Sequence, residues 1–140
     1  MNLFFTNVNW VAVLAAAVLN MTIGSLWYSS LVLGKQWTKL MEGSGKNLAE
    51  MKKGAVKAYA VSFLSALLLA YVLASVVSAL DAFNVLQGAT VAFWLWLGFI
   101  ATTSLSGVLF EQRSFNLYLI NAGYYLVSFL LMGALFAAWQ

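Results

Sequence analysis

The sequence predicts an all-α integral membrane protein, a bundle of four membrane-spanning helices in which successive helices are antiparallel. Two observations carry this prediction. Four long runs of residues contain no Asp, Glu, Lys, Arg or His, and 64% of the 140 residues are hydrophobic whereas only 8% are charged. A soluble domain carries about 25% charged residues. The composition therefore indicates a lipid environment, and the length indicates a single transmembrane domain over residues 1–140.

Each run is long enough to cross a bilayer, because about 20 residues rising 1.5 Å each span a hydrocarbon core of roughly 30 Å. The uncharged runs cover residues 8–33, 58–80, 85–110 and 117–139. The predicted helices have the same bounds, except that the second covers 48–80. The residues suited to cap their N-termini are, in chain order, Asn7 or Asn9, Asn47 with Glu50, Asn84 with Gln87, and Ser114 or Asn116. The second helix is predicted to begin before the membrane, as amphipathic turns at the lipid headgroups.

The basic residues predict the orientation. Six lysines lie in the connector 34–57 and the one arginine lies in the connector 111–116, whereas the remaining connector and both chain ends carry no basic residue. The positive-inside rule places these two connectors in the cytoplasm and both termini outside. We therefore expect a multi-pass protein of the bacterial inner membrane, with anionic headgroups near the lysine-rich connector. The net charge of +3 then reflects topology, and no nucleic-acid partner is expected.

The chain contains no cysteine and no histidine. Disulfides, thiolate nucleophiles and the commonest metal ligand are therefore absent, and neither a metal nor another cofactor is expected. All carboxylates lie near the predicted membrane surfaces, so catalysis would have to be assembled at the cytoplasmic rim. The sequence thus favours a protein that is not an enzyme. Because residues 1–10 hold no basic stretch, no cleavable signal peptide is expected.

Small residues recur at intervals of four and predict where the helices pack. Lipid does not drive helices together as water does, so close approach of backbones is a main source of packing energy. The residues expected at helix contacts are Ala12, Ala16, Gly24, Ser62, Ala66, Ala70, Ala74, Gly98 and Gly133. A separate observation is that segment 59–64 matches segment 125–130 at five of six positions. Either a duplicated helical hairpin or a chance match in so apolar a sequence would produce this similarity.

Polar side chains within the runs define a candidate pocket. Asn20 and Asn121 are the most polar groups expected in or near the hydrocarbon, and their amides serve either as hydrogen-bonding contacts between helices or as contacts for a ligand. Glu111 is the acidic residue nearest a membrane segment, either a functional carboxylate or a surface charge paired with Arg113. Most aromatic residues fit interfacial belts. The candidate pocket comprises Asn20, Trp27, Tyr28, Glu111, Asn121 and Tyr125.

Six short blocks stand in order along nearly the whole chain, at residues 9–13, 24–29, 34–37, 96–99, 110–111 and 121–125. The most specific read Trp27-Tyr28-Ser29 and Asn121-Ala122-Gly123-Tyr124. Together the blocks resemble the bacterial membrane family called domain of unknown function 1761 (DUF family 1761). The resemblance implies a small four-helix membrane protein and no particular activity. Ser30 stands where the family often has proline, and Tyr125 where it often has histidine, so no protonation role is carried over to Tyr125.

Two functions remain open on the sequence. A bundle that acts through helix association, as a homo-oligomer or as an accessory subunit of a membrane protein partner, agrees with the small-residue stripes and the lack of reactive groups. An oligomeric transporter or channel for a small neutral or lipophilic compound agrees with helix interiors that hold no charge for ion coupling. We expect the first and keep the second as the alternative.

Overall fold

A computed structural model describes residues 8–43 and 54–139. Its helices are α1 (Trp10–Trp27), α2 (Gly34–Gly43), α4 (Ala55–Ala79), α5 (Val85–Leu95), the π-helical η1 (Trp96–Ala101), α6 (Thr102–Phe110) and α7 (Phe115–Ala138). Within the described residues, four stretches are long and apolar enough to span a membrane: Trp10–Trp27, Ala55–Ala79, Val85–Phe110 and Phe115–Ala138. The predicted all-α fold with four membrane-spanning helices is confirmed.

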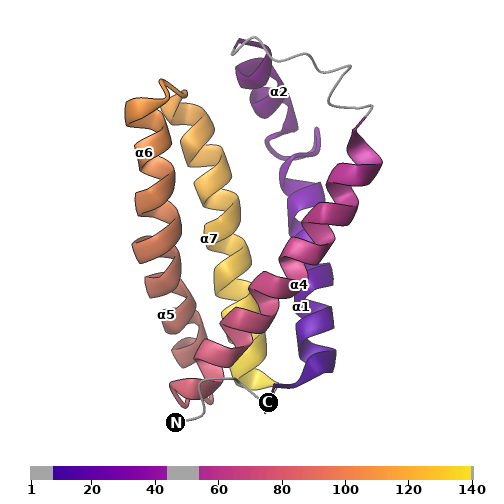
Figure 1. Cartoon of the computed structure of the whole chain (residues 1–140), viewed down its shortest axis with the longest axis vertical. Helices are drawn as coiled ribbons and strands as arrows, with labels where there is room; N and C mark the ends of the chain where they lie inside the picture. The colour runs from indigo at the N-terminus through magenta and orange to yellow at the C-terminus, as the bar shows by residue number, and fades with distance from the viewer. Residues whose placement is uncertain (1–7, 44–53, 140) are drawn as a thin grey trace.

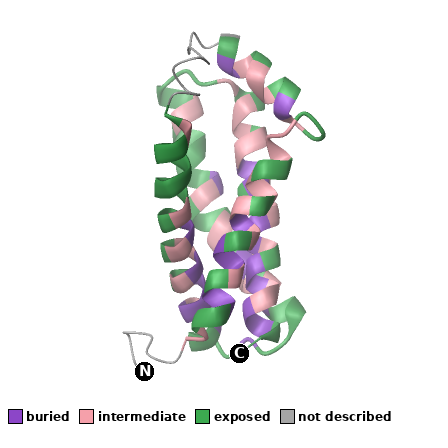
Figure 2. Ribbon diagram, turned by 90° about the vertical axis from the view of Figure 1, so that its right-hand side faces the viewer, coloured by how far each residue is buried: buried purple, intermediate pink, exposed green. Residues whose placement is uncertain are grey.

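The four spans form a bundle that is closed at one end and open at the other. All of them converge where α1 begins and α7 ends, whereas α4 diverges from α6 and α7 toward the end that carries α2 (Figure 1). Buried residues gather in the converging half (Figure 2). Its core contains Ala12, Val13, Ala16, Ala70, Leu73, Val77, Ala92, Met132 and Phe136. The small side chains predicted to allow close helix packing therefore contribute to the closed end.

The first helix is shorter than the predicted span 8–33. α1 ends at Trp27, and a tight turn over residues 28–33 leads into α2. The Ser29 hydroxyl donates to the carbonyl oxygen of Leu26 at 2.6 Å and accepts from the Leu31 N–H at 3.3 Å. Such local side-chain bonds compete with the helical backbone pattern. The apolar composition of the turn conceals this break from a prediction based on hydropathy.

The predicted lysine-rich connector contains a further helix, α2. Lys35 and Lys39 are exposed on it, whereas Met41 is buried. This pattern makes α2 an amphipathic element at the open end. The amphipathic turns predicted before the second span begin at residue 48, so their first six residues lie outside the described residues. The cap predicted at Asn47 lies outside the described residues. The second span is described from Ala55, where α4 begins.

The structure also shows which cap residues act. Asn9, Asn84 and Ser114 each accept hydrogen bonds from backbone N–H groups in the first turn of α1, α5 and α7, over 2.9 to 3.4 Å. These bonds satisfy donors that a helix start leaves unpaired. Of the alternatives left open by the sequence, Asn9 and Ser114 are the ones used.

The third span is continuous but contains a π-helical segment. Along its packed face the spacing is four residues from Gly88 to Ala92 and to Trp96, then five to Ala101. A π turn closes i to i+5 bonds and so holds one residue more than an α turn. The Trp96 Nε1–H donates to an α7 carbonyl at 2.9 Å, and the Tyr118 hydroxyl donates to the carbonyl oxygen of Ala101 at 2.8 Å. The π segment is thereby joined to α7.

The predicted packing residues differ in their positions. Those that are buried are Ala12, Ala16, Ala66, Ala70, Ala74 and Gly133, and Gly24 is half-buried. Ser62 and Gly98 depart from the prediction, because both are exposed and a Cβ at Gly98 would meet no atom within 4 Å. Gly98 follows Trp96 of the packed face by two residues, which places it on another side of the helix. The third span contacts α7 through Gly88 instead, whose added Cβ would collide with the backbone of Gly133.

Asp81, in the turn between α4 and α5, has a φ of 52°. The Asp81 N–H donates to the carbonyl oxygen of Ser78 at 3.1 Å, and the Ala82 N–H donates to the carbonyl oxygen of Val77 at 3.2 Å. These bonds form a helix C-terminal cap, in which the residue with the left-handed conformation is usually glycine. We expect Asp81→Gly to raise the free energy of unfolding by up to about 1 kcal/mol, because glycine has no Cβ to strain there. Detergent-titrated unfolding followed by circular dichroism measures this. Asp81→Ala, which keeps the Cβ, should give no gain, and an equal gain would contradict the explanation.

Candidate functional site

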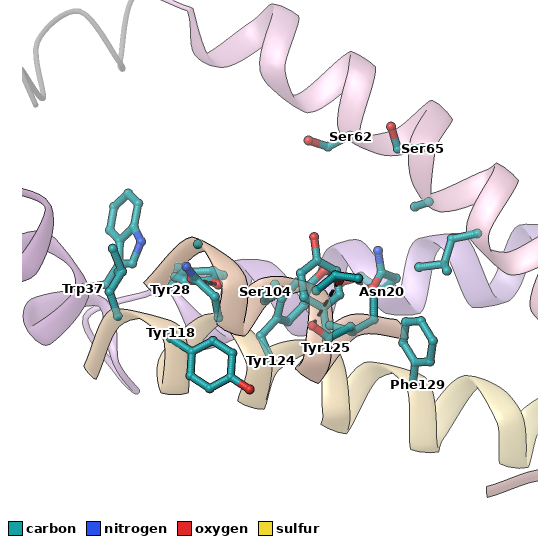
Figure 3. A pocket seen from close by; sticks show the side chains of 18 of the residues that line it. Asn20, Tyr28, Trp37, Ser62, Ser65, Ser104, Tyr118, Tyr124, Tyr125 and Phe129 are labelled. Atoms are coloured by element: carbon teal, nitrogen blue, oxygen red, sulfur yellow. Dashed lines mark hydrogen bonds between the residues drawn. The ribbon is translucent and has the colours of Figure 1, made fainter. Parts of the chain in front are cut away.

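A crevice of about 1240 Å³ opens between α1, α4, α6 and α7 where α4 diverges. Figure 3 shows Ser62 and Ser65 of α4 on one side and Asn20, Tyr28 and Tyr124 on the other. Segments 56–62 of α4 and 102–106 of α6 are exposed on every side. No other helix of the described chain therefore covers these two walls. Sites for drug-sized ligands are typically about 300–1,000 Å³, so this crevice has room for a molecule of at least that size.

Asn20 of α1 forms the buried end of the crevice, with 6% of its surface exposed. Its Oδ1 accepts hydrogen bonds from the hydroxyls of Ser128 and Tyr124, the latter at 3.0 Å. The Tyr124 hydroxyl also lies 3.1 Å from the backbone oxygen of Asn20. Gly24 leaves room for this ring, since a Cβ there would lie 3.1 Å from the hydroxyl oxygen. The side-chain oxygen of Asn20 is thus occupied, and its Nδ2 points into the crevice (Figure 3).

Nearer the open end, the last residues of α1 contact α7 through two further hydrogen bonds. The Trp27 Nε1–H donates to the carbonyl oxygen of Ile120 at 2.9 Å, and the Tyr28 hydroxyl donates to Oδ1 of Asn121 at 2.6 Å. Burial raises the pKa of Tyr28 above its ordinary value. The phenol therefore stays protonated at neutral pH and remains a hydrogen-bond donor. These bonds hold α1 and α7 together beside the crevice.

Glu111 and Arg113 lie at the rim. The Arg113 guanidinium and the Glu111 carboxylate are 2.7 Å apart, and their side chains are 65% and 59% exposed. An exposed pair of this kind adds about 0–1 kcal/mol to stability. Among the described residues that line the crevice, these two are the only charged ones. Their pairing leaves the lining without net charge.

The crevice brings together most of the predicted pocket residues. Its lining includes Asn20, Tyr28, Glu111, Asn121 and Tyr125. Trp27 is not part of the lining and packs between α1 and α7, where its ring would lie 3.2 Å from a Cβ at Gly123. Sequence reasoning missed Tyr124, which fits an interfacial aromatic belt and contacts Asn20 beside the Ser128 hydroxyl. The four-residue spacing of these two hydroxyls on one face of α7 was the available signal.

The lining offers hydrogen bonds rather than acid–base chemistry. Its hydroxyl-bearing residues include Ser25, Ser62, Ser65, Ser104 and Ser106. Within hydrocarbon an unpaired polar group carries a free-energy cost, which water or a polar ligand removes. Among the described residues, no cluster of His, Cys, Asp or Glu is suited to hold a metal ion. The site is therefore suited to an uncharged molecule that forms hydrogen bonds.

Four apolar spans around a polar crevice define a small polytopic membrane protein. The chain matches a family model described as protein of unknown function (DUF1761) over residues 11–137, and it belongs to that family. The resemblance carried by the sequence blocks is thereby confirmed over nearly the whole chain. No curated protein and no solved structure matched the sequence.

Proposed function

We propose that this protein binds a small uncharged or lipophilic compound in the crevice and, as an oligomer, moves it through the membrane. The observation that carries the proposal is a crevice at membrane depth whose lining holds amides and hydroxyls, with charge only at the rim. An ion would find no counter-charge beside Asn20, and charges in hydrocarbon are costly. The converging half of the bundle closes the path, so a second copy or a rearrangement is needed for passage.

The protein is proposed to act without catalysis. Acid–base or nucleophilic chemistry requires a group that exchanges protons or attacks a substrate near neutral pH. Among the described residues, the crevice lining contains no lysine, and its one carboxylate, on Glu111, is paired with Arg113 at the rim. The raised pKa of Tyr28 argues against a role as a base. These features support binding rather than turnover.

We place the protein in the bacterial inner membrane, with the crevice open to the cytoplasm and both termini outside. The sequence assigns all seven basic residues to the predicted connectors 34–57 and 111–116, and the described parts of both connectors lie at the open end (Figure 1). Lys35 and Lys39 are exposed on α2, in position to contact anionic lipid headgroups. A groove of about 800 Å³ beside α2, lined by Lys39, Gln112 and Asn116 among others, offers further polar contacts at this level.

A second candidate is the function through helix association, as a homo-oligomer or an accessory subunit. It is favoured by the uncovered walls 56–62 and 102–106, which include Ala58, Ser104 and Ser106. Small residues of this kind allow another helix to approach closely. In that case a helix of a second copy or of a partner would fill the crevice, and no small compound would enter.

Cysteine labelling separates the two candidates, because the chain has no cysteine of its own. Methanethiosulfonate reagents react with the thiolate, which forms in water and not in hydrocarbon. We expect Ser104→Cys and Ser65→Cys, in native membranes, to react about tenfold or more faster than Leu105→Cys. Leu105 is a matched control, since it neighbours Ser104 at nearly the same depth but does not line the crevice.

The side of labelling and the products complete the experiment. Reagent applied to inverted vesicles should reach Ser104→Cys, and reagent applied to spheroplasts should not. Equal, slow labelling of Ser104→Cys and Leu105→Cys would contradict the open crevice. Slow labelling of Ser104→Cys, combined with oxidant-driven crosslinking of this variant between two copies, would favour helix association, because a helix of the second copy would then fill the crevice.

A further inference from the structure

The buried end of the crevice is chemically one-sided. Both hydroxyls that contact the Asn20 side chain, on Ser128 and Tyr124, donate to Oδ1, and the Nδ2 side of the amide faces the crevice (Figure 3). The Nδ2 group on the other side has no acceptor among the described residues. Among the described residues no fully buried side-chain nitrogen or oxygen atom lacks a partner, so the Nδ2 group is accessible from the crevice. The Asn20 side chain therefore offers the crevice donors only, and the complement of this group is a hydrogen-bond acceptor.

The surroundings of Asn20 define the rest of the ligand. Asn20 lies seven residues before the end of α1, or about 10 Å along the helix axis from Trp27. The nearby lining contains the apolar side chains of Leu69, Ile100 and Phe129. A charged ligand group at this depth would meet no counter-ion. The complementary group is thus uncharged and is attached to an apolar body.

We propose that the crevice binds the carbonyl oxygen of an uncharged apolar ligand, with the Asn20 side-chain amide as donor. This inference rests on the proposed function, since it specifies the compound that the crevice takes. A carbonyl oxygen accepts two hydrogen bonds and carries no proton. It therefore matches the two N–H donors of the Asn20 amide. Two sources share this chemistry: a quinone, and the ester group of a neutral acyl lipid.

Equilibrium binding to the purified protein in dodecyl maltoside tests the inference, because this detergent contains no carbonyl group. The probes are tritiated 2-decyl-1,4-benzoquinone and, by competition, 1,2-dioctanoylglycerol, with empty micelles subtracted. Decylbenzene, which has a similar apolar body and no carbonyl, is the matched control ligand. We expect at least one carbonyl probe to bind the wild-type protein about tenfold more tightly than decylbenzene, as one hydrogen bond in a buried site would give.

The variant Asn20→Leu removes the donor and keeps the side-chain volume similar. In this variant the Tyr124 hydroxyl still has an acceptor, because it also contacts the backbone oxygen of residue 20. We expect this variant to bind the quinone and decylbenzene equally. Ser62→Ala, on the opposite wall, is the control and should keep the tenfold preference. Should Asn20→Leu fail to fold, the comparison of probes on the wild-type protein still decides.

The outcomes separate the inference from the proposed function. Equal binding of carbonyl and hydrocarbon probes to the wild-type protein would overturn the inference while leaving a crevice that binds apolar compounds. A preference that survives Asn20→Leu would also overturn it, since the donor would lie elsewhere. No binding of any probe would overturn both. Preference for the quinone alone, or for the diacylglycerol alone, would support the inference and identify the source of the carbonyl.

Discussion

Replacing Gly133 with alanine is expected to destabilise the bundle by about 2–3 kcal/mol, a typical cost of an overpacked core. Gly133 of α7 crosses Gly88 of α5 at backbone distance. A Cβ on Gly133 would collide with the carbonyl oxygen of Gly88 and lie 2.6 Å from the Cβ of Ala92. Neither obstacle is a flexible side chain, so the helices must separate. The unfolding midpoint in a detergent titration, followed by circular dichroism, measures the loss.

Gly98→Ala is the matched control, the same substitution in the third span where the added methyl meets nothing within 4 Å. It should be neutral or stabilise by up to about 1 kcal/mol, since alanine favours a helix. Gly88→Ala should resemble Gly133→Ala, because its Cβ would lie 2.6 Å from that of Ala137. The variant with both substitutions should lose less stability than the sum of the two single losses, because one separation of the helices makes room for both methyl groups. Equal effects of Gly98→Ala and Gly133→Ala would show that the crossing is not tightly packed.

The four spans follow from the sequence because hydropathy and charge act on whole segments. A run such as 85–110 contains no charged residue, and its observed bounds agree with the prediction. Backbone events inside an apolar run leave no such signal. The turn after Trp27 and the π segment depend on local hydrogen bonds and close contacts, so hydropathy continues smoothly through both. The internal hairpin repeat stays a prediction.

The candidate site was predictable where polarity conflicts with location. Asn20 and Asn121 are conspicuous because an amide within a membrane span needs partners. The partner of Asn121, Tyr28, was within the predicted set, whereas Tyr124, which contacts Asn20, was not. Tyrosine suits both an interfacial belt and a buried hydrogen bond, so its identity does not decide between them. The rotation of α7 about its axis relative to α1 decides whether Tyr124 faces the lipid interface or Asn20, and the sequence leaves that rotation undetermined.

The two halves of the bundle are held together by different forces, which explains how a crevice persists beside a packed core. At the closed end, alanine and glycine allow backbones to approach, and dispersion contacts dominate. Beside the crevice, α1 and α7 are joined by directed hydrogen bonds from Trp27, Tyr28 and Tyr124. Directed bonds hold one pair of helices without requiring α4 or α6 to close over them. The crevice thus follows from which residues form the contact.

Replacing Gly34 with alanine is expected to cost about 2 kcal/mol or more, by the same overpacking argument. Gly34 begins α2, and its N–H donates to the carbonyl oxygen of Ser29 at 2.8 Å. A Cβ on Gly34 would lie 2.5 Å from this oxygen and 2.5 Å from that of Tyr28. Both are backbone atoms of a tight turn and cannot move aside independently. We therefore expect the turn to open and α2 to shift.

The effect should extend to the rim of the crevice, because Tyr28 contacts Trp37 of α2 edge to face, with ring centroids 5.5 Å apart. A shift of α2 in Gly34→Ala would disturb this pair and, with it, the position of Tyr28. Asn121→Leu removes the acceptor of the Tyr28 hydroxyl. Its loss of stability should therefore be smaller in the Gly34→Ala background than in the wild-type protein. Gly107→Ala is the control for the substitution itself. Its Cβ would lie 3.7 Å from the nearest atom, so its unfolding midpoint should not fall. A midpoint for Gly34→Ala as high as that of Gly107→Ala would mean that the turn accepts a side chain.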